Sequence, residues 1–284
     1  MEIKDLKKQD FPPLLLQIDD PPKSMRIVGE LPKTEKYLCV VGSRKYSDYG
    51  KNVCEKLIEG LRGYSITIVS GLALGMDAIA HRAALKAGLP TIAVPGSGLG
   101  DKSIYPRTNR SLADEIVKSG GALISEFEDD WLPRLYSFPQ RNRIMAGMSH
   151  ATFIIEAELK SGTLITSKYA IEYNRDVFTV PNSIFSKTSE GPHMLLRLGA
   201  TPITQPSDII TALGLRPRDE LLQVRDYSEC STDERELIDL IKEPLSRDQI
   251  IQRLGKPVYV TQTILATMEI KGLIEESMGE IHLR

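Results

Sequence analysis

Short apolar runs alternate along the chain with longer segments of helical character. The apolar runs are typical of buried strands, and they predict strands at Tyr37–Val41, Thr67–Val69, Thr91–Val94, Ala122–Ile124, Ala151–Ile155 and Asp176–Val180. The segments between them predict helices at Tyr49–Leu61, Asp77–Ala87, Asn109–Lys118, Ile144–Met148 and Thr163–Tyr173. This alternation predicts an α/β fold with a doubly wound, mostly parallel sheet and helices on both faces.

The α/β domain is predicted to span residues 36–214, and a proline-rich segment precedes it. Residues 1–35 are interrupted at Phe11-Pro12-Pro13, Asp20-Pro21-Pro22 and Leu31-Pro32, so we expect them to be irregular. Their apolar residues, Leu14 and Leu15 among them, indicate that the segment packs on the α/β domain rather than standing free.

A different pattern follows the α/β domain. A polar stretch containing Arg216-Pro217-Arg218 predicts a linker over residues 215–231. Residues 232–284 then predict three helices, with Thr232 and Ser246 as N-caps of the first two, and a hairpin. The predicted elements are helices at Asp233–Lys242, Arg247–Leu254 and Val260–Lys271 and strands at Leu273–Glu276 and Glu280–Leu283. This order predicts a small winged-helix domain.

Charge is distributed unevenly between the two domains. The 284 residues carry a net charge of -2, but residues 219–284 hold 14 acidic and 8 basic residues, which leaves 28 basic and 24 acidic residues before them. Phosphate binding is therefore expected in the large domain. The third helix of the tail has one Lys and one Glu, too few cations to hold DNA, so a protein-docking role is favoured there.

Composition points to a soluble protein of a reducing compartment. No run approaches the ~18 apolar residues that span a bilayer, and the start of the chain does not resemble a secretion signal. The three cysteines, Cys39, Cys54 and Cys230, are widely spaced. We therefore expect a cytoplasmic protein without a membrane segment.

Small and cationic residues gather where the predicted strands end, which is where doubly wound sheets bind ligands. Gly42-Ser43-Arg44 follows the first strand, Ser70-Gly71 the second, and Ser161-Gly162-Thr163 opens a helix. A helix start offers unpaired N–H groups and a positive dipole end to an anion. Arg141 and Arg143, which flank Asn142 ahead of a predicted helix, add two guanidiniums to this phosphate site.

Further cations accompany one aromatic residue. Phe138 lies near Arg134 and the two arginines after it, a combination that suits stacking on single-stranded nucleic acid. Arg107 and Arg110 share one loop and helix start. A core role for Phe138, a solvated face for the loop arginines and a surface ion pair for Arg44 remain open alternatives.

Signals for other chemistries are weak. Asp77 and His81 lie four residues apart on one helix, but no third metal ligand follows, so a structural hydrogen bond is favoured. A dinucleotide fingerprint fails because Arg44 stands where a second glycine is needed. We find neither a Ser-His-Asp order nor a poised acid pair, and we predict no catalytic residue, metal or cofactor.

Taken together, these segments resemble the DprA/Smf (DNA processing protein A) family. The resemblance is carried by FPPLLLQIDDPP, VVGSRKYSDYG, IVSGLALGMDAIAHRAAL, TIAVPGSGLG, YPRTNR, SEFEDDWLPRLYSFPQRNRIMAGMS, EAELKSGTLIT and NRDVFTVPNSI. It implies an extended Rossmann-like domain, a homodimer, and a protein that binds single-stranded DNA without sequence preference, protects incoming DNA and loads RecA during natural transformation. The acidic winged-helix domain would serve an interaction role.

The resemblance also assigns residues. Arg44 and Arg107 would contact DNA, Phe138 would stack on a base, and Arg141, Arg143 and Ser161-Gly162-Thr163 would line the same pocket. Many relatives carry Lys where Leu135 stands here, with Arg134 adjacent. The full set of expected DNA-binding residues is Ser43, Arg44, Gly71, Arg107, Arg110, Arg134, Phe138, Arg141, Asn142, Arg143, Ser161, Gly162 and Thr163.

Two enzyme classes are alternatives. The lysine-decarboxylase-like phosphoribohydrolases, which cleave nucleoside monophosphates, place a catalytic Glu three residues after the Thr of their PGGxGTxxE motif. Here that position is Thr166, and Lys160-Ser161 replaces the paired glycines. Without this carboxylate, acid–base help for glycosidic cleavage is hard to supply. A nicotinamide-dependent oxidoreductase is disfavoured by the missing fingerprint.

Overall fold

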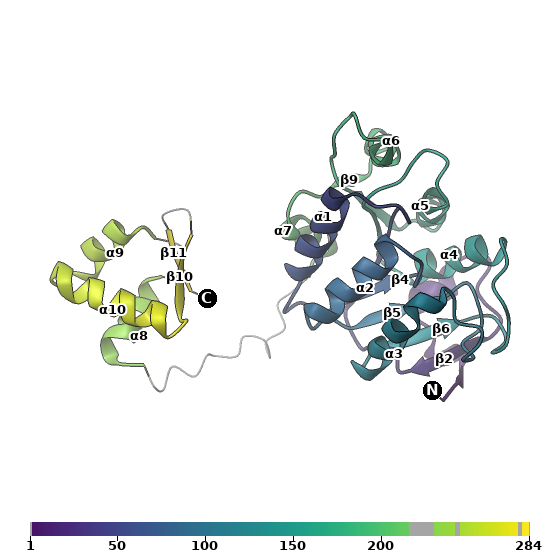
Figure 1. Ribbon diagram of the computed structural model, residues 1–284, viewed down its shortest axis with the longest axis horizontal. Coiled ribbons are helices and arrows are strands. Elements are labelled where there is room, and N and C mark those ends of the chain that lie inside the picture. The colour runs from purple at the N-terminus through teal and green to yellow at the C-terminus, as the bar shows by residue number, and fades with distance from the viewer. Residues whose placement is uncertain (1, 216–229, 242–244, 278–279, 284) are drawn as a thin grey trace. The chain divides into compact units, whose positions relative to one another are not determined.

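The structure is a computed structural model that describes residues 2–215, 230–241, 245–277 and 280–283. The chain divides into two compact units, residues 1–221 and 222–284. Each unit has its own hydrophobic core, and each is described by itself (Figure 1).

A nine-stranded sheet forms the centre of the first unit (Figure 1). Seven strands are parallel, in the order β6-β5-β4-β3-β7-β8-β9, and β2 and β1 extend the β6 edge in antiparallel orientation. The strands are β1 (Lys4–Leu6), β2 (Met25–Gly29), β3 (Lys36–Val41), β4 (Ile66–Ser70), β5 (Thr91–Ala93), β6 (Ala122–Ser125), β7 (Ala151–Ile154), β8 (Asp176–Thr179) and β9 (Thr201–Pro202). The direction of winding reverses at β3, which places a topological switch point between β3 and β7.

Helices cover both faces because alternate side chains of each strand point to opposite sides. Leu38 and Val40 of β3 pack in a core with α1, α2 and α7, whereas Cys39 and Val41 pack with α4, α5 and the N-terminal segment. The helices are α1 (Asp48–Glu59), α2 (Met76–Lys86), α3 (Arg110–Lys118), α4 (Ser137–Met148), α5 (Thr163–Glu172), α6 (Glu190–Arg197) and α7 (Pro206–Leu213), with 3-10 turns η1 (Lys8–Asp10), η2 (Pro13–Gln17), η3 (Arg107–Asn109) and η4 (Lys187–Ser189).

The predicted α/β fold is confirmed, with one helix displaced. Each of the six predicted strands ends within one residue of its observed bounds. Helix α4, however, begins at Ser137 rather than at Ile144, so the prediction that Arg141, Asn142 and Arg143 precede the helix is wrong. Pro139 lies in the first turn, where a missing N–H is tolerated, and Arg141, Asn142 and Arg143 after it are buried.

The N-terminal segment is more regular than predicted. It supplies β1 and β2, and β2 pairs with β6 from Arg26 opposite Ser125 to Gly29 opposite Ala122. Leu15 of η2 is fully buried in the core below α4. The segment therefore packs on the sheet and also extends it. Helices α6 and α7 and strand β9 were not predicted.

The second unit is a winged helix built from α8 (Thr232–Leu240), α9 (Arg247–Leu254), α10 (Val258–Ile270) and the antiparallel pair β10 (Ile274–Ser277) and β11 (Glu280–Leu283). The N-cap of α8 is Ser231 rather than the predicted Thr232, since the Ser231 side chain and Glu234 form a reciprocal capping box. Ser246 caps α9 as predicted. Residues 216–229 of the predicted linker lie outside the described residues. In the described parts of the chain, every helix is too short or too polar to cross a bilayer.

Candidate nucleic-acid interface

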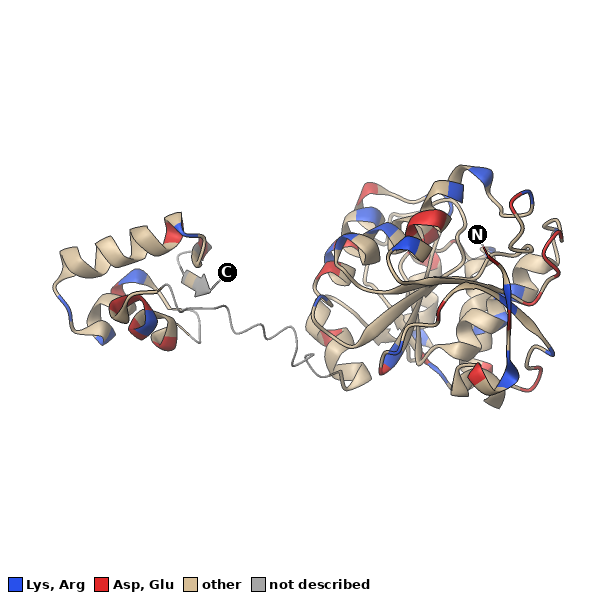
Figure 2. Cartoon of the chain, turned by 90° about the horizontal axis from the view of Figure 1, so that it is seen from below, with Lys and Arg blue, Asp and Glu red and all other residues tan. Residues whose placement is uncertain are grey.

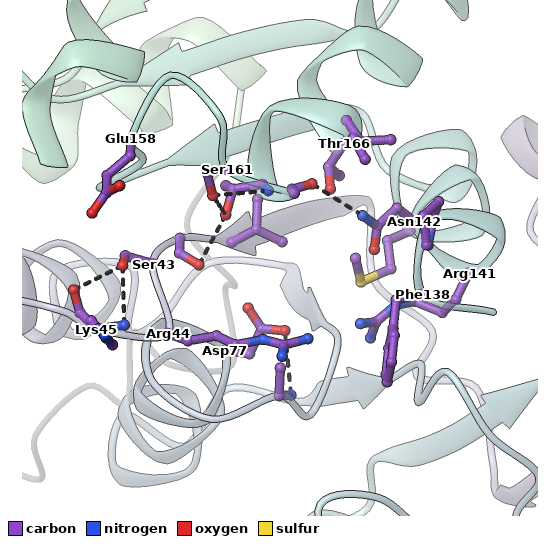
Figure 3. A pocket seen from close by; sticks show the side chains of 18 residues that line it. Ser43, Arg44, Lys45, Asp77, Phe138, Arg141, Asn142, Glu158, Ser161 and Thr166 are labelled. Carbon is purple, nitrogen blue, oxygen red and sulfur yellow. Dashed lines mark hydrogen bonds between the residues drawn. The ribbon is translucent and has the colours of Figure 1, made fainter. Parts of the chain in front are cut away.

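A cleft of about 450 Å³ opens at the switch point, where the turns after β3 and β7 meet α4 and α5. This is the position at which a doubly wound sheet binds ligands. In Figure 3, Arg44, Arg141 and Phe138 project into the same opening that Ser161 and Thr166 border. The lining residues are Val41, Gly42, Ser43, Arg44, Lys45, Ala73, Asp77, Phe138, Pro139, Arg141, Asn142, Met145, Glu158, Ser161, Gly162, Thr163, Ile165 and Thr166.

The turn after β3 presents an exposed guanidinium. The Ser43 hydroxyl accepts a hydrogen bond from the Lys45 N–H at 3.0 Å and donates to the Lys45 carbonyl at 2.8 Å, which fixes the turn. Arg44 is exposed, and its guanidinium carbon lies 5.4 Å from the centroid of the Phe138 ring. Neither Arg44 nor Lys45 forms an ion pair with another described residue. Both charges are therefore available to an anion.

Helix α4 supplies the aromatic ring and a buried cation. Phe138 is half-buried, and its ring packs so closely on Gly96 that a Cβ there would lie 2.7 Å from Cδ1. The Arg141 side chain is 4% exposed and donates to the Val94 carbonyl. Its guanidinium lies against Gly71, where a Cβ would come within 1.9 Å of Nη1. Gly71 thus makes room for Arg141.

Burial and opposite charge act against each other at Arg141 and Asp77. Burial lowers the pKa of Arg141, and the neighbouring Asp77 carboxylate raises it. Burial likewise raises the pKa of Asp77, while Arg141 and the Ala73 N–H lower it. Asp77 accepts from the Ala73 N–H at 3.4 Å, and no ion pair joins it to Arg141 among the described contacts.

Arg143 does not line the cleft, contrary to the prediction. It is 6% exposed, forms an ion pair with Glu126 and donates to the Asp20 carbonyl at 2.7 Å. Successive residues of an α-helix are rotated by roughly 100°, so Arg141 and Arg143 face nearly opposite directions. Asn142, between them, reaches the cleft and donates to the Gly162 carbonyl at 3.5 Å.

The start of α5 contributes hydroxyls more than unpaired N–H groups. The Thr163 N–H donates to the Ser161 hydroxyl at 3.2 Å, and the next two N–H groups donate to the carbonyls of Ser161 and Gly162. The Thr163 hydroxyl donates to the Gly42 carbonyl at 3.0 Å, which ties α5 to the β3 turn. A Cβ at Gly162 would meet nothing within 4 Å, so the backbone here faces open space.

Three other predicted cations lie off the cleft. Arg110 forms ion pairs with Asp101 and Asp114. Arg134 places its guanidinium carbon 5.4 Å from the centroid of the Trp131 ring, and Arg107 is exposed on η3. Since none of the three lines the cleft, the site that the structure brings together is narrower than the predicted one.

Sequence reasoning missed the carboxylates of the site. Asp77 and Glu158 both line the cleft, as does Lys45. Asp77 was considered only with His81, whose Nδ1 instead shares a hydrogen bond with the Thr91 hydroxyl at 2.7 Å. In the described part of the chain no group of three or more metal-ligating side chains converges. The one sequence signal that could have placed Asp77 in the cleft is its position two residues after the Gly75 turn, at the start of α2.

Comparison with known proteins assigns the family. A family model described as DNA recombination-mediator protein A matches residues 3–214, and the DprA winged helix domain model matches residues 225–280. The chain belongs to the DNA recombination-mediator protein A family. Both units thus fall within this family's architecture, and the predicted resemblance to DprA/Smf proteins is confirmed.

Relatives and solved structures agree with the assignment. Protein Smf of Escherichia coli K12 is 39% identical over 277 residues, which cover 95% of this chain and 74% of Smf. DprA of Bacillus subtilis is 37% identical over 213 residues, 74% of this chain and 71% of that protein. The structure of DprA from Streptococcus pneumoniae matches with a TM-score of 0.69 at 39% identity and covers 74% of both chains. A Helicobacter pylori DprA structure, described for its single-stranded DNA binding mode, matches with a TM-score of 0.67 at 31% identity and covers 75% of this chain and 95% of that one.

Proposed function

We propose that the protein binds single-stranded DNA in the switch-point cleft without sequence preference. The observation that carries this proposal is the convergence of Arg44, Arg141 and the Phe138 ring on one opening. Unpaired cations suit phosphates, and an aromatic face suits any unstacked base.

The distribution of charge in the cleft favours a flexible polyanion. Arg44 and Lys45 lie at the exposed rim, where successive phosphates can pass, and Arg141 supplies a positive field from below. Asp77 and Glu158 partly offset these charges, so the site is not strongly cationic and a strand is held by stacking as well as by charge. In this mechanism Arg44 contacts a phosphate while a base covers Phe138.

Family membership supports the same reading and extends it. The H. pylori relative is described as binding single-stranded DNA. As the DprA/Smf resemblance implies, we propose that this protein protects incoming DNA and loads RecA during natural transformation, and that it acts as a homodimer in the cytoplasm. A docking role for a protein partner is proposed for the winged-helix unit.

A binding role is favoured over nucleotide cleavage. The position that carries the catalytic Glu in phosphoribohydrolases is Thr166, which lines the cleft with a hydroxyl. Asp77, the buried carboxylate of the cleft, accepts a backbone N–H and lies deep beside Arg141. Such a carboxylate compensates the charge of a neighbouring cation.

Fluorescence anisotropy with labelled oligo-dT and a matched duplex tests the proposal. We expect tighter binding of the single strand at every salt concentration. Arg44→Ala should weaken binding to oligo-dT and oligo-dA alike and make the slope of log Kd against log salt shallower by about one. Arg110→Ala, which removes an equal charge held by Asp101 and Asp114, serves as the control and should bind as wild type.

Two results would contradict the proposal. If the Arg44→Ala and Arg141→Ala variants both bind oligo-dT as tightly as wild type, the cleft is not where the DNA binds. Release of adenine from AMP by the wild-type protein, lost in Asp77→Asn, would instead indicate the hydrolase alternative.

A further inference from the structure

Phe138 separates the main cleft from a second, smaller depression. The depression measures about 20 Å³, too little to enclose a base, so a ligand would lie on it rather than inside it. Arg44, Ala73, Phe138 and Arg141 line both spaces. The remaining lining residues are Gly71, Leu74, Tyr105 and Pro106. The two spaces therefore adjoin each other around one aromatic ring and one exposed guanidinium.

The rim of this depression is apolar and exposed. Tyr105 is 45% exposed and Leu74 is 50% exposed, although both are side chains that normally gain by burial. The Tyr105 and Phe138 ring centroids are 6.0 Å apart and the rings are inclined at 49°, so they form an open angle rather than a closed stack. Within the described residues the Tyr105 hydroxyl makes no hydrogen bond that would fix it for a structural purpose.

Charge distinguishes the depression from the main cleft. The carboxylates of Asp77 and Glu158 line the cleft alone, whereas the charged groups of the depression are the guanidiniums of Arg44 and Arg141. A flat, apolar group attached to a phosphate fits such a surface, because the flat group can cover Tyr105 and Leu74 while the phosphate reaches Arg44.

We propose that this depression is a second base subsite, in which the base next to the one on Phe138 stacks on Tyr105 against Leu74. The inference builds on the proposed function, since both bases belong to one strand of single-stranded DNA. Arg44, which lines both spaces, then contacts the phosphate that joins the two nucleotides. Stacking on Tyr105 reads no base edge, so the subsite tolerates any sequence.

The test compares variants of Tyr105 in the full-length protein by anisotropy with labelled oligo-dT and oligo-dA. Tyr105→Ala should raise the Kd for both by about tenfold, the loss expected for one base–aromatic stack. Tyr105→Phe, which keeps the ring, should bind as wild type. The slope of log Kd against log salt should not change in Tyr105→Ala, because no phosphate contact is removed.

Tyr136→Ala is the matched control, because Tyr136 is 52% exposed next to α4 and lines neither space. Leu74→Ser provides a second variant if Tyr105→Ala proves unstable, and it should also weaken binding with an unchanged salt slope. A strand carrying 2-aminopurine should lose part of its fluorescence quenching in either variant.

The outcomes separate this inference from the proposed function. If Tyr105→Ala and Leu74→Ser bind like wild type while Arg44→Ala binds weakly, the second subsite is wrong and the cleft assignment stands. If Arg44→Ala also binds like wild type, the proposed function fails first. A shallower salt slope in Tyr105→Ala would overturn stacking as the role of Tyr105.

Discussion

Arg141 and Arg143 lie two positions apart in α4. Of these two arginines, Arg143 alone forms an ion pair with a described residue. Arg143 pairs with Glu126 and Asp20, whereas Arg141 donates to the Val94 carbonyl and forms no ion pair with a described residue. Burying a cation without a paired anion is costly. The nearby Asp77 carboxylate offsets part of the charge of Arg141 without forming an ion pair. A buried guanidinium of this kind beside an open cleft is suited to an anionic ligand.

This difference predicts that Arg143→Ala lowers stability, whereas Arg141→Ala lowers affinity for DNA. Arg143→Ala leaves the largely buried Glu126 carboxylate without its ion-pair partner and should lower the free energy of unfolding by about 3 kcal/mol, measured by urea denaturation. The folded variant should bind oligo-dT as tightly as wild type. Arg141→Ala should weaken binding. If Arg143→Ala keeps normal stability but loses affinity for DNA, the result would support the DNA-binding role that the sequence predicts for Arg143.

The sequence was sufficient to predict which types of residue form the site. It was not sufficient to predict the directions in which their side chains point. The spacing of Arg141 and Arg143 around Asn142 predicted one shared site, because the helix was expected to begin after them. Once the helix includes them, its rotation alone separates the two arginines. The contact of Gly71 with Arg141 was equally hidden, since it joins a turn after β4 to a helix distant in the chain.

The N-terminal segment packs against α4, the helix that supplies Phe138 and Arg141 to the cleft. Leu15 and Ile18 pack so closely on Gly147 of α4 that a Cβ there would lie 2.8 Å from Ile18 and 3.4 Å from Leu15. Arg143 reaches back to the Asp20 carbonyl, and Arg175 donates to the Leu14 carbonyl at 2.9 Å. The position of Phe138 and Arg141 therefore depends on a segment that the sequence predicted only as a packed, irregular one.

Two neighbouring leucines test this dependence. Leu15 is fully buried, so Leu15→Ala should lower the free energy of unfolding by about 3 kcal/mol through lost burial and a residual cavity. Leu16 is 39% exposed, and Leu16→Ala should change it by less than about 0.5 kcal/mol. Thermal or urea unfolding measures both. Equal effects would mean that the segment does not form part of the core.

The strands of this segment were missed for a local reason. β2 is short, contains Arg26 and follows a proline cluster, so its sequence resembles a loop. It becomes a strand because β6 would otherwise present an unpaired edge. The predicted parallel strands carry their own signal in continuous apolar runs, whereas an edge strand depends on its neighbour.

For the whole molecule, the topology places the candidate cleft, and the charge balance favours phosphate binding in the first unit. The order of strands around β3 places the cleft at the switch point, a position that alternation of strand and helix was sufficient to predict. In the described part of the winged-helix unit, basic and acidic residues are interspersed (Figure 2), and several of the cations are paired with carboxylates. Arg247 pairs with Glu269 and Glu276, and Lys256 pairs with Asp233 and Glu236.

The recognition-type helix of that unit also lacks the cations that DNA binding requires. In α10 the one charged residue is Glu269, which Arg247 neutralises, and the exposed positions include Tyr259 and Ile270. Neutralisation of phosphates by Lys and Arg supplies most non-specific affinity for DNA. An uncharged, partly apolar helix face suits contact with a protein better.

Truncation after residue 221 should therefore leave single-stranded DNA binding intact. We expect the Kd for oligo-dT to agree with that of the full-length protein within about twofold and the salt slope to be the same, because the phosphate contacts proposed above all lie in the first unit. Anisotropy at several salt concentrations measures both quantities, and circular dichroism confirms that the shortened chain is folded. A clearly weaker Kd with a shallower slope would show that the winged-helix unit grips the DNA itself, whereas a tighter Kd with an unchanged cleft would show that its net negative charge opposes the incoming strand.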